Sequence, residues 1–255
     1  MSLEGAIRYD RPLEVDTVGD PVPHFARRIP PNATVLDIGC GPGVLGRLAT
    51  ALKPCLLDGI EIDPEAAQEA RRYYRDVRVA DLGSSELAEL LPGRRYDIVI
   101  CADVLEHLEA PGRMLRQIRR ILAPGGRLFI SLPHVGYAGI VAELLTGRFR
   151  YRPSGLLDRT HLRFFTRAEL TDTLTMNGFA VMDFGGIVKP VHESEFGTVL
   201  DRLAPAVRDG LLTAPDALIY QFLVEAVPGR SAVLPAGADW SQALLQSNRP
   251  EDGLE

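Results

Sequence analysis

The chain has 255 residues, of which 46% are hydrophobic and 24% charged, and it carries a formal net charge of -6 at pH 7. These values are ordinary for one α/β domain with a small extension, and the negative charge excludes a global basic field that would recruit nucleic acid or an anionic membrane. We find no signal peptide and no apolar run long enough to span a bilayer, so we expect a cytoplasmic protein. The three cysteines, Cys40, Cys55 and Cys101, match no zinc motif, and their odd number argues against a disulfide framework.

Residues 1–33 form a lead-in to the main domain. Prolines interrupt this segment repeatedly, so it cannot be one long helix. The stretch from His24 to Pro30 is compatible with a short helix over the sheet edge. Such a helix would either cover a ligand or simply pack against the core.

The segment from Thr34 to Gly46 predicts a strand, a tight turn and the start of a helix. Thr34 to Ile38 is an apolar run of the kind found in strands that are covered on both faces. Glycines then occupy three of the next five positions, and helical sequence begins at Val44. Because glycine tolerates positive φ and lets a ligand approach bare backbone, this turn predicts a cofactor site at the carboxyl edge of a parallel sheet.

The remaining sequence alternates between predicted strands and helices. We expect strands at 34–38, 56–62, 76–80, 96–101 and 127–132, and helices at 44–52, 64–74 and 110–122. A helix at 167–176 and strands at 179–184 and 217–227 follow. This alternation predicts an α/β fold: a doubly wound, Rossmann-like sheet of seven strands with helices on both faces.

Two families share a glycine turn of this kind. Gly41, Gly43 and Gly46 satisfy the dinucleotide pattern G-x-G-x-x-G, but Asp37 lies where a pyrophosphate would be repelled and a cationic ligand attracted. The pattern D-x-G-x-G-x-G, formed by Asp37, Gly39, Gly41 and Gly43, resembles the first motif of class I S-adenosylmethionine methyltransferases. The helix, the Pro-Gly-Gly turn at 124–126 and the strand that follows it also resemble this family, and they argue against an NAD-dependent oxidoreductase.

The resemblance implies a donor site for S-adenosylmethionine, with S-adenosylhomocysteine as product. Asp37 would lie near the amino-acid part of the donor, Glu61 would bind the ribose hydroxyls, Ile62 would flank the adenine and Asp81 would accept from its amino group. We read Asp63 as the N-cap of the next helix. The resemblance assigns the following residues to the donor site: Asp37, Gly39, Cys40, Gly41, Gly43, Glu61, Ile62, Asp81, Leu82 and Ala102. It also implies a methyltransferase domain at 34–227, an acceptor-side insertion at 135–165 and a C-terminal tail at 228–255.

The acceptor site is expected beyond the fourth and fifth strands, where three histidines lie. They are His107, His134 and His161. The segment Gly155 to Thr166 resembles bacterial methyltransferases of glycan biosynthesis, and that resemblance puts Asp158 and His161 at the acceptor. We expect His161 to be the general base with Asp158 orienting it, and we keep His134 as a further catalytic candidate. The alternative is a purely structural role, with Asp158 as a helix cap and His161 as a buried histidine.

A divalent metal is left open as an alternative. Asp103-x-x-Glu106-His107 resembles the E-x-x-E-H pattern of small-RNA 2′-O-methyltransferases and ubiquinone-pathway O-methyltransferases, although Asp replaces the first Glu. By that resemblance Glu106, His107 and His161 would be metal ligands, and such a donor set suits a divalent ion.

The insertion also carries five arginines among aromatic residues: Arg148, Arg150, Arg152, Arg159 and Arg163. Guanidinium groups bind phosphate in a bidentate manner, so these residues favour a phosphorylated or otherwise anionic acceptor. A solvated loop with a few core aromatics is the alternative.

The function expected from these patterns is methyl transfer to a hydroxyl of a small molecule or glycan. N-methylation, a protein or RNA acceptor, and a non-catalytic donor-binding module stay as alternatives, although the net negative charge argues against nucleic acid. A homodimer is left open, because the insertion and the tail would both suit an interface.

Overall fold

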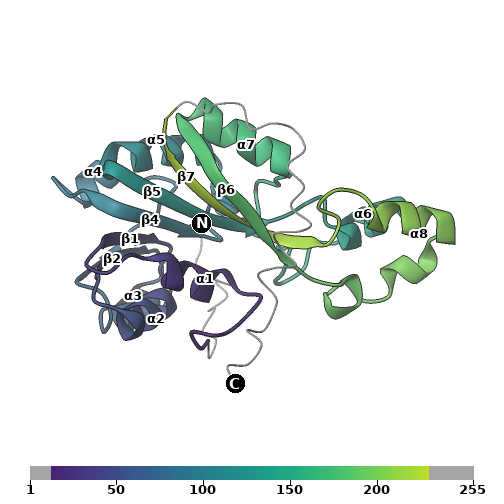
Figure 1. The fold of residues 1–255 in the computed structure, drawn as a ribbon, viewed down its shortest axis with the longest axis horizontal. Helices are drawn as coiled ribbons and strands as arrows, with labels where there is room; N and C mark the ends of the chain where they lie inside the picture. Colours follow the sequence, from purple (N-terminus) through teal and green to yellow (C-terminus); the bar gives the residue numbers. More distant parts are fainter. Residues whose placement is uncertain (1–12, 230–255) are drawn as a thin grey trace, which may run out of the picture.

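The computed structural model describes residues 13–229. Its centre is a seven-stranded sheet in the order β3-β2-β1-β4-β5-β7-β6 (Figure 1). The strands are β1 (Thr34–Ile38), β2 (Leu56–Glu61), β3 (Asp76–Val79), β4 (Tyr96–Ala102), β5 (Leu122–Pro133), β6 (Phe179–Val188) and β7 (Ile219–Pro228). The first five strands run parallel, whereas β7 is antiparallel to both β5 and β6. The expected α/β fold and its seven strands are confirmed.

Helices cover both faces of this sheet. They are α1 (Pro21–Arg28), α2 (Val44–Leu52), α3 (Pro64–Ala70), α4 (Leu87–Leu90), α5 (Pro111–Ile121), α6 (Ala138–Leu145), α7 (Arg167–Met176) and α8 (Pro205–Leu212), with short 3-10 helices η1 (Leu105–His107), η2 (Val191–Glu193) and η3 (Val199–Arg202). Figure 1 shows α1, α2 and α3 on one face and α4, α5 and α7 on the other. No helix within the described part of the chain is both long enough and apolar enough to cross a membrane.

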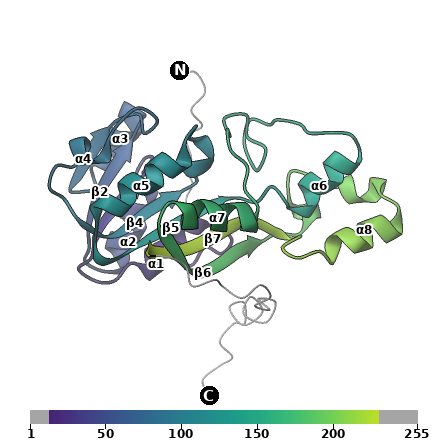
Figure 2. The same cartoon turned by 90° about the horizontal axis from the view of Figure 1, so that it is seen from above.

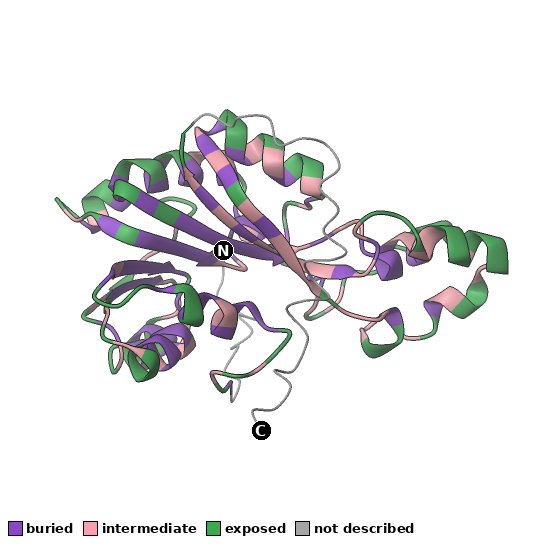
Figure 3. Cartoon of the chain, viewed as in Figure 1, coloured by how far each residue is buried: buried purple, intermediate pink, exposed green. Residues whose placement is uncertain are grey.

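Alternation along the strands builds the two main cores. In β1, Leu36 and Ile38 belong to the cluster under α5 and α7, whereas Val35 belongs to the cluster under α1 and α2. Both faces of the central strands are therefore buried, as Figure 3 shows, which explains their nearly continuous apolar sequences. The neighbours of β1 are β2 on one side and β4 on the other, so the direction of chain winding reverses between β1 and β4. A crevice outside the carboxyl ends of the strands at such a reversal is the usual place for a ligand in this class of sheet.

A third apolar cluster lies beyond the end of the sheet. It joins Tyr137, Leu156 and Leu157 to Phe196 and Ala217. Figures 1 and 2 show the corresponding elements, α6 and α8, side by side away from the sheet. The predicted insertion at 135–165 is therefore half of a small subdomain, and the segment between β6 and β7 supplies the other half.

Several element boundaries differ from the sequence-based prediction. The third helix ends at Ala70 rather than at residue 74, β5 begins at Leu122 rather than at residue 127, and β6 continues to Val188. The predicted helical cap by Asp63 is confirmed, since its carboxylate accepts from the backbone N–H of Glu65 at 2.8 Å. The three cysteines are free thiols. The predicted tail at 228–255 lies outside the described residues from 230 onward.

Candidate active site

A cavity of about 700 Å³ opens at the carboxyl ends of β1, β2 and β4. Nine of the ten residues predicted for the donor line it: Asp37, Gly39, Cys40, Gly41, Glu61, Ile62, Asp81, Leu82 and Ala102. Gly43 does not. It has φ of +92°, and a Cβ there would lie 2.8 Å from the Cα of Ala70, so Gly43 instead permits the close approach of α3.

The glycine turn is held by the end of β2. The backbone N–H groups of Gly39 and Cys40 donate to the carbonyl of Ile60 at 2.8 and 3.1 Å. The Glu61 carboxylate accepts from the N–H of Gly41 at 2.8 Å through one oxygen and from Ile62 at 2.8 Å through the other. Glu61 thus fixes the turn and at the same time faces the cavity.

Asp37 is buried at the base of the cavity. Its carboxylate accepts a hydrogen bond of 2.5 Å from the hydroxyl of Tyr74. Burial raises the pKa of Asp37 to about 7, the bond from Tyr74 opposes this rise, and the charge of Glu61 adds to it. Sequence reasoning missed Tyr74, because it predicted that the residue continues α3.

The walls of the cavity include residues that no motif predicted. Leu13, Val22 and Phe25 come from the lead-in, which therefore contributes an apolar wall to the cavity rather than only packing on the core. Asp81 is exposed at the opposite end, where its carboxylate accepts from the N–H of Gly83 at 2.8 Å. In the sequence, only the apolar face of the Pro21–Arg28 helix indicated that the lead-in would add a wall to the cavity.

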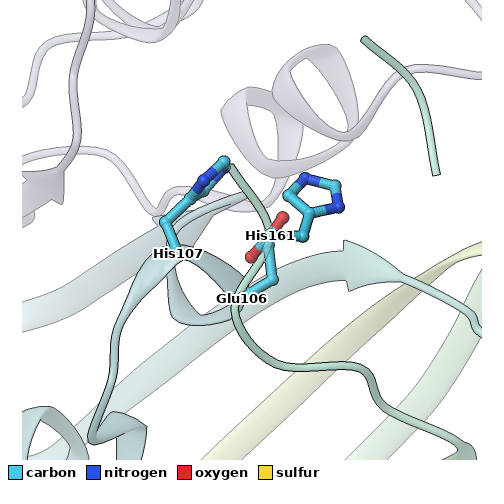
Figure 4. A group of neighbouring side chains, drawn as sticks. All are labelled: Glu106, His107 and His161. Atoms are coloured by element: carbon cyan, nitrogen blue, oxygen red, sulfur yellow. The ribbon is translucent and has the colours of Figure 1, made fainter. Parts of the chain in front are cut away.

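A second group of side chains lies where η1 meets the loop before α7. One nitrogen of His107, one nitrogen of His161 and one carboxylate oxygen of Glu106 lie within 4.8 Å of one another (Figure 4). The backbone N–H groups of Leu162 and Arg163 both donate to the carbonyl of Glu106, at 2.8 and 3.0 Å, and so tie the loop to η1. His107 and Leu162 line the same cavity, so this group borders it.

Both imidazole rings are oriented by backbone carbonyls. The Nδ1 of His161 lies 3.1 Å from the carbonyl of Leu156, and the Nδ1 of His107 lies 3.3 Å from that of Thr160. Because a carbonyl only accepts, the Nδ1 of His161 carries the proton. The Nδ1 of His107 also lies 3.1 Å from the hydroxyl of Thr160, which donates its own proton to Asp158 at 2.7 Å and therefore accepts from the ring. Each Nε2 thus keeps its lone pair. Burial lowers the pKa of both rings, so both are neutral at pH 7.

Glu106 is 1% exposed, and neither of its carboxylate oxygens has a hydrogen-bond partner in any other described residue. Burial, followed by the negative charge of Asp103, raises the pKa of Glu106 well above its ordinary value. Asp103 itself turns toward the sheet, where it accepts from Ser131 at 3.2 Å and from the amide of Gln221. The first acid of the predicted metal motif is therefore outside the group of three.

Two of the predicted catalytic residues make other contacts in the structure. Asp158 does not hold the ring of His161. It accepts from the N–H and hydroxyl of Thr160, at 2.8 and 2.7 Å, and thus caps its own loop. His134 is buried against Phe222, donates to the carbonyl of Ile219 at 3.0 Å and does not line the cavity. It connects β5 to β7 as a core residue.

A comparison with known families decides the class of protein. The model of a family described as a methyltransferase domain matches residues 9–183, which is more than half of the chain. The chain belongs to this methyltransferase family. The donor site and the fold make it a class I S-adenosylmethionine-dependent methyltransferase.

Individual relatives share modest sequence identity with this methyltransferase. It is 30% identical over 159 residues to the ubiquinone biosynthesis O-methyltransferase of Aeromonas salmonicida, an alignment that covers 60% of this chain and 65% of the relative. The chain thus spans slightly less than two thirds of that protein. A methyltransferase structure from Mesorhizobium loti has a TM-score of 0.54 at 19% identity, covering 83% of this chain and 99% of the other. A [4+2]-cyclase has a TM-score of 0.55 at 18% identity, covering 86% of each chain, so the fold alone does not fix the reaction.

The arginines of the methyltransferase insertion divide into two groups. Arg152 pairs with Glu143 at 2.7 Å, and Arg163 donates to the carbonyl of Glu109 at 2.6 Å, so both support the structure. The others are exposed, without a side-chain partner among the described residues. These are Arg148, Arg150 and Arg159. The prediction of five acceptor-binding arginines is thereby reduced to three.

Proposed function

We propose that this methyltransferase transfers the methyl group of S-adenosylmethionine to a hydroxyl of a small molecule, and that Glu106, His107 and His161 hold a divalent cation at the acceptor. The name of the Aeromonas relative, a ubiquinone biosynthesis O-methyltransferase, supports oxygen as the acceptor atom. The position of the three side chains beside the donor cavity supports their role.

The observation that carries the metal proposal is the orphaned carboxylate of Glu106. A buried carboxylate without hydrogen bonds is costly, and proteins retain such groups when a ligand or ion completes them. One carboxylate and two neutral imidazoles are also the donor types that suit first-row divalent ions such as Mn²⁺ and Zn²⁺. Backbone carbonyls on both Nδ1 atoms are the kind of outer contact that orients metal-binding histidines.

Such a cation would lower the pKa of an acceptor hydroxyl and fix its oxygen near the donor methyl. The chain's own residues supply the rest. The glycine turn and Glu61 hold the donor, and the loop 155–165 holds His161 against η1 through its bonds to the carbonyl of Glu106. Methyl transfer from a sulfonium needs alignment more than covalent help, so positioning accounts for most of the work expected from the protein.

We further propose an anionic acceptor, with a phosphorylated sugar or glycan as the first class to test. Arg148, Arg150 and Arg159 support this because their exposed guanidinium groups have no other partner among the described residues. Arg159 lies in the loop 155–165 itself, two residues before His161. The sequence resemblance of Gly155 to Thr166 to glycan-modifying methyltransferases agrees with it. A homodimer and a cytoplasmic location stay predictions from the sequence.

The experiment is methyl transfer from labelled S-adenosylmethionine into separated acceptor pools, with and without a chelator. The pools are sugar phosphates, lipid-linked glycans, neutral phenols, amines, protein and RNA. Donor binding is followed by calorimetry in parallel, and Mn²⁺, Zn²⁺ or Mg²⁺ is added back after chelation. We expect label in a hydroxyl-bearing pool, loss of transfer on chelation and unchanged donor affinity.

Transfer that survives complete chelation would contradict the metal proposal and leave His161 as the general base, since its Nε2 carries a lone pair. Label in amines, protein or RNA would contradict the acceptor class and leave the donor site intact. Donor binding without transfer into any pool would favour a non-catalytic module.

A further inference from the structure

Tyr74 fills the space behind the glycine turn. It lies just after α3, is 6% exposed and belongs to the cluster under α1 and α2. Its ring occupies space that two glycines leave open. A Cβ on Gly46 would lie 2.3 Å from the ring and a Cβ on Gly59 would lie 3.2 Å from it. The ring therefore packs against the first turn of α2 and against β2 at once.

The hydroxyl of Tyr74 joins two parts of the donor site. It donates to the Asp37 carboxylate at 2.5 Å and accepts from the backbone N–H of Gly46 at 3.0 Å. Gly46 lies in the first turn of α2, where backbone N–H groups have no partner within the helix. The N-cap of this helix, Gly43, has no side chain to supply one. The single hydroxyl of Tyr74 thus accepts from a free N–H group of the helix and donates to the carboxylate of Asp37.

We propose that Tyr74 is a positioning residue for donor binding, which keeps the Asp37 carboxylate and the first turn of α2 in the arrangement that receives the cationic donor. This inference rests on the S-adenosylmethionine site and not on the proposed metal or acceptor. It assigns a role to a residue outside the glycine motif, contributed by the segment that follows α3.

The surroundings of Asp37 give this role a measurable signature. The groups that face it are Tyr74, Glu61 from β2, Cys40 from the turn and Cys101 from β4. Burial raises the pKa of both thiols, so they stay neutral, and Glu61 opposes ionisation of Asp37. Tyr74 is the neighbour whose hydrogen bond favours the ionised carboxylate.

The sign of the pH effect follows directly. Below the pKa of Asp37 the carboxyl is neutral and does not attract a cation, whereas above it the carboxylate does. Donor affinity should therefore rise with pH through about 7 in the wild-type protein. Without the phenol the pKa of Asp37 is higher still, so the same rise should occur at higher pH.

The test compares Tyr74→Phe with Tyr73→Phe in the full chain. Tyr73 is the matched control, because it is the adjacent tyrosine and its hydroxyl has no hydrogen bond within residues 13–229. Calorimetry gives the Kd for S-adenosylmethionine from pH 5.5 to 8.5 (a range of about three units around the midpoint), and thermal unfolding reports folding. We expect Tyr74→Phe to fold, to bind about tenfold more weakly at pH 7 and to show the affinity rise at higher pH. Tyr73→Phe should match the wild type, and Asp37→Asn should bind without the rise.

A merely structural tyrosine would give a different result. If Tyr74→Phe unfolds at a lower temperature but keeps the wild-type Kd and the wild-type pH midpoint, the proposal is wrong. It is also wrong if Asp37→Asn retains the full pH dependence, because the carboxylate would then not be the group that Tyr74 adjusts. Neither measurement needs an acceptor or a metal, so failure here leaves the proposed function standing.

Discussion

At the scale of single residues, the buried carboxylate of Glu106 is expected to lower the free energy of unfolding of the metal-free protein. Its carboxylate is buried between two imidazoles without a hydrogen bond among the described residues. Removing an unpartnered buried polar group often stabilises a protein. We predict that Glu106→Met raises the unfolding free energy of the metal-free protein by about 1 to 3 kcal/mol, and that it removes both methyl transfer and the stabilisation by added Mn²⁺ or Zn²⁺.

Thermal unfolding with and without the metal tests this prediction, and Glu89→Met is the matched control. Glu89 is exposed on α4, so its replacement should change neither stability nor the response to metal. A metal-free Glu106→Met protein that is less stable than the wild type would show that the carboxylate has a structural partner. Retained stabilisation by metal would show that the cation binds elsewhere.

The residues that line the cavity predicted for the donor could be identified from the sequence, whereas the orientation of the proposed acceptor residues could not. Asp37, Gly39 and Gly41 lie within one strand and its turn, so their arrangement is local. The bond from His161 to the carbonyl of Leu156, in contrast, depends on how the loop 155–165 folds back. An Asp three residues before a His is compatible with many loop conformations. Here the Asp caps Thr160 instead.

At the scale of elements, α2 packs closely against the residues that follow α3, behind the glycine turn. Gly46 lies inside α2, where alanine normally stabilises a helix. Its Cβ would, however, meet the Tyr74 ring at 2.3 Å. We predict that Gly46→Ala lowers the unfolding free energy by about 1 to 3 kcal/mol and weakens binding of S-adenosylmethionine, because the ring must move away from Asp37.

Gly210→Ala is the control for this substitution. Gly210 also lies in a helix, α8, but apart from the helix's own backbone no atom of residues 13–229 lies within 4 Å of the position of its Cβ. Alanine should therefore stabilise that helix by up to about 1 kcal/mol and leave donor affinity unchanged. Calorimetry and thermal unfolding of both variants check the pair. A Gly46→Ala protein with wild-type donor affinity would mean that the turn tolerates displacement of Tyr74.

The same junction explains why one helix boundary was wrong. Residues 71–74 contain two arginines and two tyrosines, and nothing in their helix propensity marks an end at Ala70. The helix stops because Tyr74 packs back under the glycine turn, a tertiary contact that outweighs local preference. The helix Arg167–Met176 was predicted to the residue, since Thr166 caps it and Asn177 and Gly178 end it. Elements with local start and stop signals were thus predictable.

At the scale of the whole molecule, the proposed acceptor group combines residues from the edge of the sheet with one from the subdomain. The cavity predicted for the donor is built from the strand ends and the lead-in, and Glu106 and His107 come from η1 beside it. His161, in contrast, comes from the loop 155–165, whose Leu156 and Leu157 belong to the apolar cluster around α6 and α8. A brace holds this subdomain together. Arg152 donates to the carboxylate of Glu143 at 2.7 Å and to the carbonyl of Glu195 at 2.8 Å, and it lies over the ring of Phe196. The brace therefore joins the two chain segments that sequence reasoning treated separately.

Arg152→Met should reduce methyl transfer without weakening the binding of the donor. Loss of the guanidinium leaves Glu143 buried without its ion pair, a change that costs up to about 3 kcal/mol and falls on the subdomain alone. We predict that methyl transfer falls by about tenfold or more, because small displacements of acceptor groups are costly, while donor affinity stays within about twofold of the wild type. Hydrogen exchange should rise in 135–166 and 189–218 but not in β1 or α2.

Arg202→Met, an exposed change in η3 of the same subdomain, should alter none of these. Equal loss of donor binding in Arg152→Met would mean that the two halves form one cooperative unit and that the acceptor loop also organises the donor cavity.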